Sequence, residues 1–169
     1  NTPLLWKSLN SYLDQHPDIK SKFILRFIGQ IDPAVFKSIT DSGVNFTVEN
    51  HNAMPHSQLQ EQLAAAHILL LIAVPNDPGV ITGKLFEYLF CKKPILSISP
   101  TNSDLALILE DSRGGFNADF TDLSAIQDAV VRTFEAVQKN NFLPNSEVIE
   151  QFSRKNLTKK LSEILNQMV

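Results

Sequence analysis

The sequence predicts an α/β fold in which one parallel sheet carries helices on both faces. Short apolar segments alternate with segments of helical periodicity along the 169 residues. The segment 68–73 is continuously apolar, which is typical of a strand covered on both faces of a parallel sheet. Because parallel strands are joined by right-handed crossovers, the alternation predicts a doubly wound, Rossmann-like sheet.

Residues that favour helix ends and turns set the expected bounds in the first half of the chain. Thr2 is a favoured N-cap and Pro3 suits the first helical position, so a helix is expected to begin there. Gly29 and Gly43 each follow a patterned segment and are expected to end it. The predicted elements are a helix at 2–16, a strand at 23–28, a helix at 32–43, a strand at 44–48 and a helix at 55–66.

The second half continues the alternation. Its predicted elements are a strand at 68–73, a helix at 82–91, a strand at 94–98, a helix at 103–111, a short edge strand at 115–117 and a helix at 121–139. Residues 145–169 are expected to form a helical tail. We therefore predict a single domain over 1–169. Because a helix precedes the first strand, we expect this domain to be an excised part of a longer, two-domain protein.

Charge, hydropathy and cysteine content indicate which binding partners and which cellular compartment to expect. The net charge is −3 and the charges are mixed along the chain, so no nucleic-acid surface is predicted. No apolar run reaches the length of a membrane span, no secretory signal is present, and Cys91 is the sole cysteine, which favours the cytoplasm. A basic segment with helical spacing is typical of a solvated face, but its apolar side leaves peripheral contact with the inner face of a membrane open. That segment contains Arg154, Lys155, Leu157, Lys159, Lys160, Leu161 and Ile164.

The predicted helix at 82–91 carries the main chemical signal. Lys84 lies in its first turn, where the helix dipole is already positive, so the sequence favours an anion between the backbone and the lysine. Free N–H groups at a helix start suit a phosphate. Glu87 follows by three residues on the same face and could bind sugar hydroxyls. Together these residues predict a nucleotide site.

Simpler interpretations exist for the same residues. Lys84 and Glu87 could form a solvated ion pair, and Gly83 could be an incidental helix glycine. Asp77, in a loop rich in Pro and Gly, is more often a turn former than a sugar ligand. No metal site is predicted, because the four histidines and the cysteine lack the spacing of metal ligands.

The segments ITGKLFEYL at 81–89 and KKPILSI at 92–98 resemble the signature of retaining glycosyltransferases of family 4. Weaker matches in the same order are FIG at 27–29, MPH at 54–56, AHILLL at 66–71 and SDLA at 103–106. The resemblance spans almost the whole chain and is to the C-terminal, nucleotide-sugar-binding half of a GT-B fold. It implies a UDP- or GDP-sugar donor, transfer with retention, and no required metal or other cofactor.

The resemblance also implies roles for individual residues. Glu87 would bind the ribose of the donor, and backbone amides at Thr82, Gly83, Lys84 and Leu85 would face the diphosphate. Two further loops would lie near the donor, with Gly29 close to it and the base approached by Asn52 and Met54.

The sequence departs from the family pattern in one important place. The first of the family's two glutamates would fall at the position of Gly79. Either Asp77 substitutes for it, or the donor sugar is held differently. The acceptor-binding half is also missing, so we expect an N-terminal acceptor-binding domain of the same protein as partner. The fragment alone is not expected to transfer sugar.

A second class of function stays open. The chain could be a non-catalytic Rossmann-like module that binds a nucleotide or a partner protein. A phosphate-receiver domain would need an acidic cluster at the strand ends, and a dinucleotide-binding domain would need GxGxxG after its first strand; neither motif is present. A sugar-nucleotide epimerase would need acid–base residues that the sequence does not display.

Overall fold

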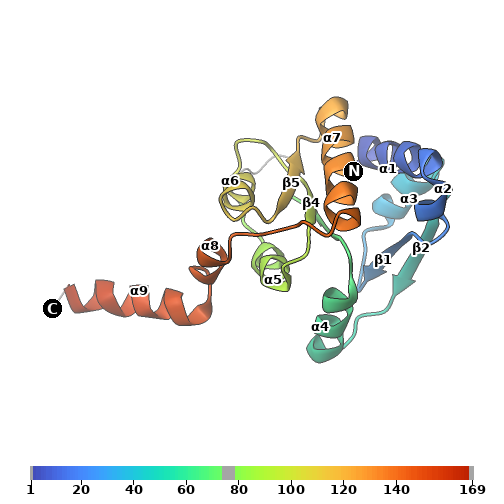
Figure 1. Cartoon of the computed structure of the whole chain (residues 1–169). Helices are drawn as coiled ribbons and strands as arrows, with labels where there is room; N and C mark the ends of the chain where they lie inside the picture. Colours follow the sequence, from blue (N-terminus) through green and yellow to red (C-terminus); the bar gives the residue numbers. More distant parts are fainter. Residues whose placement is uncertain (1, 74–78, 168–169) are drawn as a thin grey trace.

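The computed structural model describes residues 2–73 and 79–167 and has the predicted α/β architecture, with parallel strands between helices (Figure 1). In chain order, the elements are α1 (Pro3–Gln15), α2 (Pro17–Lys20), β1 (Ile24–Ile28), α3 (Pro33–Asp41), β2 (Thr47–His51), α4 (His56–Ala65), β3 (Leu69–Ile72), α5 (Gly83–Cys91), β4 (Ile95–Ile98), α6 (Asp104–Asp111), β5 (Gly115–Ala118), α7 (Leu123–Gln138), α8 (Ser146–Glu150) and α9 (Arg154–Gln167).

The strands form two parallel sheets rather than the single sheet that the sequence predicts. One sheet pairs β1 with β2, and the other has the order β3-β4-β5. Within the described part of the chain, β1 and β3 are not hydrogen-bonded to each other. The Rossmann-like class is confirmed, but the sheet is divided between β1 and β3.

Two apolar clusters hold the layers together; the first includes residues of all five described strands, whereas the second includes strand residues of β3 and β4 alone. The first joins α1, α3 and α7 to alternate residues of the strands and contains the fully buried Trp6, whose indole N–H donates to the Ser38 hydroxyl at 3.2 Å. The second joins α4, α5, α6 and α8 to the opposite strand faces. Along β3 the side chains alternate between the two clusters, with Leu70 in the first and Leu69 in the second.

Side-chain caps fix several helix starts. The Asp32 carboxylate accepts from the Ala34 N–H at 2.8 Å, and the Ser103 hydroxyl accepts from Ala106 at 3.2 Å. Asn145 caps α8 in the same way. Thr2 is the N-cap of α1, as predicted, although its side chain makes no capping bond.

The tail consists of a docked helix and a projecting one. Ile149 of α8 is buried in the second cluster, and the rings of Phe86 and Phe152 lie 5.1 Å apart. In contrast, α9 has no buried residue and extends away from the rest of the chain (Figure 1). No helix among the described residues combines the length and apolar character needed to cross a membrane.

Candidate functional site

The start of α5 lies beyond the carboxyl end of β3, the side on which ligands bind in open α/β sheets. Thr82 is the N-cap, in extended conformation, and α5 begins at Gly83. A Cβ built on Gly83 would meet no heavy atom of the described residues within 4 Å, so the space next to Gly83 is open on that side. Among the described residues, nothing blocks a ligand from approaching the Gly83 backbone there.

Some of the polar groups at the start of α5 have hydrogen-bond partners among the described residues, and others do not. The Leu85 N–H donates to the Thr82 C=O at 3.0 Å, and the Leu85 side chain is fully buried. The Leu85 N–H, which was predicted to face the diphosphate, is therefore already hydrogen-bonded within the chain. The N–H groups of Gly83 and Lys84 have no partner among the described residues. The Thr82 hydroxyl is buried and also has no partner there. Three donors therefore gather at one helix end.

Lys84 and Glu87 are both exposed on α5, and they do not form the ion pair that would explain them as ordinary surface residues. Within the described part of the chain, neither has another ionic partner. The predicted ammonium and carboxylate are therefore available on the same helix as the free amides.

Two groups next to Glu87 are shifted in pKa. Burial raises the pKa of the Cys91 thiol, and the negative charge of Glu87 raises it further. The Cys91 S–H donates to the Glu87 C=O at 3.2 Å. Burial followed by the Glu87 charge also raises the pKa of Tyr88. Both groups therefore stay protonated at neutral pH, and neither is suited to act as a nucleophile.

The remaining predicted site residues lie at the other sheet. Gly29 follows β1 with φ +102°, a conformation that favours glycine, and its N–H donates to the His51 C=O at 2.9 Å. Asn52 and Met54 follow β2, the next strand outward. These loops follow strands of the β1-β2 sheet, whereas α5 follows β3 of the other sheet.

Two positions of the segment before α5 were considered for a contact with the donor sugar, Asp77 and Gly79. Asp77 lies outside the described residues. Gly79, at which the sequence resemblance would place a first glutamate, is exposed and offers no side chain. The role of a first carboxylate therefore stays a prediction.

A polar cluster on β1 and β2 was not anticipated from the sequence. Arg26 Nε donates to Glu49 at 2.8 Å, and a further guanidinium N–H donates to Gln62 of α4 at 2.9 Å. His51 lies 3.0 Å from the same carboxylate. The hydrogen bonds of His51 and then Arg26 lower the pKa of Glu49. The available signal was Arg26 itself, a charged residue inside an otherwise apolar strand.

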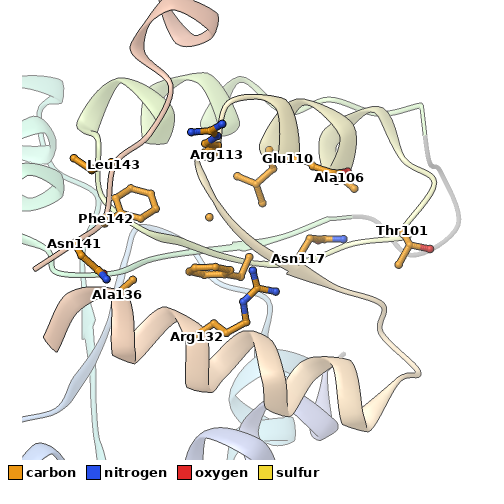
Figure 2. A pocket seen from close by; sticks show the side chains of 13 residues that line it. Thr101, Ala106, Glu110, Arg113, Asn117, Arg132, Ala136, Asn141, Phe142 and Leu143 are labelled. Carbon is orange, nitrogen blue, oxygen red and sulfur yellow. The ribbon is translucent and has the colours of Figure 1, made fainter. Parts of the chain in front are cut away.

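A cavity of about 540 Å³ lies away from the predicted site, along the outer edge of β5 between α6 and α7. Figure 2 shows Arg113 and Glu110 on the α6 side and Arg132 on the α7 side. The Arg132 guanidinium lies 4.6 Å from the centre of the Phe116 ring. None of the residues predicted to bind a nucleotide lines this cavity.

The described residues contain no cluster of His, Cys, Asp and Glu side chains that could hold a metal ion. Comparison of the chain with protein families, curated proteins and solved structures found no match. The geometry of the chain is therefore what supports a functional proposal.

Proposed function

We propose that the start of α5 binds the diphosphate and ribose of a nucleotide sugar, and that the domain is the donor-binding half of a retaining glycosyltransferase. The observation that carries this proposal is the open first turn of α5. There, the N–H groups of Gly83 and Lys84 and the buried Thr82 hydroxyl have no partner among residues 2–73 and 79–167. Lys84 and Glu87 of the same helix are exposed and have no ionic partner among those residues either.

The chemistry of these groups matches the two parts of the ligand. The amides of Gly83 and Lys84, aided by the helix dipole, stabilise the negative charge of a diphosphate. The Glu87 carboxylate is acceptor-only when ionised and pairs with ribose hydroxyls. In sugar transfer the diphosphate is the leaving group, so these donors would stabilise the charge that develops as it departs.

The proposed role is binding rather than catalysis by this chain alone. An N-terminal domain of the full-length protein would bring the acceptor to the opposite side of the donor. We therefore expect the chain to bind UDP- or GDP-sugars without transferring them.

Calorimetric titration with UDP-glucose and GDP-mannose tests the proposal. We expect saturable binding of at least one of them, weakened in Glu87→Gln by about tenfold to a hundredfold, as for a lost hydrogen bond to a charged group. Glu61→Gln on α4 is the matched control, since Glu61 is also exposed on a helix.

Two outcomes would contradict the assignment. Equal affinity in Glu87→Gln and the parent chain would remove the ribose contact. A lack of any thermal stabilisation by a panel of nucleotides would favour the alternative of a protein-interaction module.

A further inference from the structure

The edge of β1 away from β2 and the edge of β3 away from β4 have backbone N–H groups without a partner among the described residues. In β1, the Gly29 N–H donates to His51 of β2 at 2.9 Å, and successive residues of a strand point their backbone groups to alternate sides. The N–H groups of Arg26 and Ile28 therefore point away from β2. They have no hydrogen-bond partner among the described residues.

The backbone N–H groups of β3 alternate in the same way. The N–H groups of Leu69 and Ala73 donate to Pro94 and Ile98 on the β4 side, at 3.0 and 2.9 Å. Those of Leu70 and Ile72 therefore point away from β4, and no described residue accepts from them. Both residues are half-buried, and unpaired buried amides are costly.

One apolar cluster spans the division between the sheets. It contains Leu25 and Phe27 of β1 together with Leu70 and Ile72 of β3. Helix α1 contributes buried leucines to this cluster, packs mainly against α7 and also contacts α3 (Figure 1). A helix and a common core are thus in place where the sheet is interrupted.

The order of strands and helices along the chain indicates which kind of strand would fit between β1 and β3. From β1 the chain passes through α3, on the face of the first cluster, to β2. From β3 it passes through α5 and α6, on the opposite face, to β4 and β5. Such a reversal marks the centre of a doubly wound sheet. Because α1 lies on the same face as α3 and leads to β1, a strand entering α1 would complete one more right-handed crossover.

We propose that the edges of β1 and β3 take one extended strand, which leads into α1, runs parallel to both strands and joins the two sheets into one. Its residues would be apolar on both faces, as expected for a central strand of a parallel sheet. This inference does not depend on the nucleotide site.

Amide hydrogen exchange measured by NMR on the dilute monomer tests the free edges. The amides of Arg26, Ile28, Leu70 and Ile72 are expected to exchange faster than their neighbours in the same strands. Protection of these four amides in the dilute monomer would overturn the proposal. Protection that appears only as the protein concentration rises would overturn it as well, since a second copy would then cover the edges.

A strand supplied in cis tests the occupant. We would attach a short alternating Val/Ile segment through a Gly/Ser loop to the N-terminus of the chain. The four amides should slow by about tenfold or more and the Tm should rise. The control carries Pro at the centre of the added segment, which prevents ladder pairing, and should show neither effect. Unchanged exchange in the Val/Ile fusion would overturn the proposal.

Discussion

At the residue scale, the stability of the β1-β2 pair depends on pH through Glu49, whose carboxylate accepts a hydrogen bond from Arg26 on the neighbouring strand. Its pKa is held below the ordinary value of 4.5 by hydrogen bonds from His51 and Arg26. A carboxylate with a lowered pKa stabilises the fold above its unfolded pKa, and this contribution is lost as pH falls through the folded value. We therefore expect Glu49→Gln to flatten the acid side of the stability curve, measured by urea unfolding between about pH 3 and pH 7. A curve as steep as that of the parent chain would contradict this assignment.

The single thiol gives a second residue-scale prediction. The pKa of Cys91 is raised by burial and by Glu87, so little thiolate forms at neutral pH. Alkylation by iodoacetamide should be slower in the folded chain than in urea. Glu87→Gln removes the nearby negative charge and should speed the reaction modestly. An equal rate in folded and unfolded protein would show that the thiol is freely exposed.

Substitution of two glycines by alanine should affect different properties, because Gly115 is packed against backbone atoms and Gly83 is not. A Cβ on Gly115 would lie 2.0 Å from the Ile95 C=O, so Gly115→Ala should destabilise the fold by about 2–4 kcal/mol. Gly83→Ala meets open space and should leave the unfolding midpoint unchanged or raise it slightly, since alanine lowers the conformational entropy of the unfolded chain. If a phosphate approaches Gly83, the same change should weaken nucleotide binding, which calorimetry would detect. Equal losses of stability in the two variants would contradict the packing difference.

At the element scale, local signals predicted where helices begin better than where strands pair. Asp32 and Ser103 cap helices at the expected positions because capping depends on residues a few positions apart. The alternation at 44–48 placed a strand too early, since β2 is Thr47–His51. Its bounds follow from pairing with β1, where Ile24 lies opposite Thr47, and such long-range register is not visible in one segment.

For the candidate site, too, local sequence signals were more informative than the expected pairing of distant strands. Thr82, Gly83, Lys84 and Glu87 share one helix start, so a local pattern was sufficient to bring them together. The loops with Gly29 and Asn52 were assigned to the same site through the family resemblance, and the sequence pattern predicted one continuous sheet. The division of that sheet is a property of tertiary pairing, which the sequence pattern does not reveal.

At the scale of the whole molecule, the tail separates into a part that belongs to the core and a part that does not. Ile149 of α8 is 2% exposed and packs in the second cluster, whereas every described residue of α9 after its first turn is exposed. An isolated helix of this length is marginal in water, so α9 should add little to the stability of the rest.

Two truncations test this division. Ending the chain after Ser153 should change the free energy of unfolding by less than about 0.5 kcal/mol, because α9 contains no buried residue. Ending it after Asn145 also removes Ile149 and should cost about 2–4 kcal/mol, since a cavity opens beside α5. Urea unfolding of the two chains compares them directly. A large loss of stability in the chain that ends after Ser153 would mean that α9 packs against the rest of the protein in solution. The apolar side of α9, where Leu161 is 56% exposed in the structure, would then be covered by the chain itself.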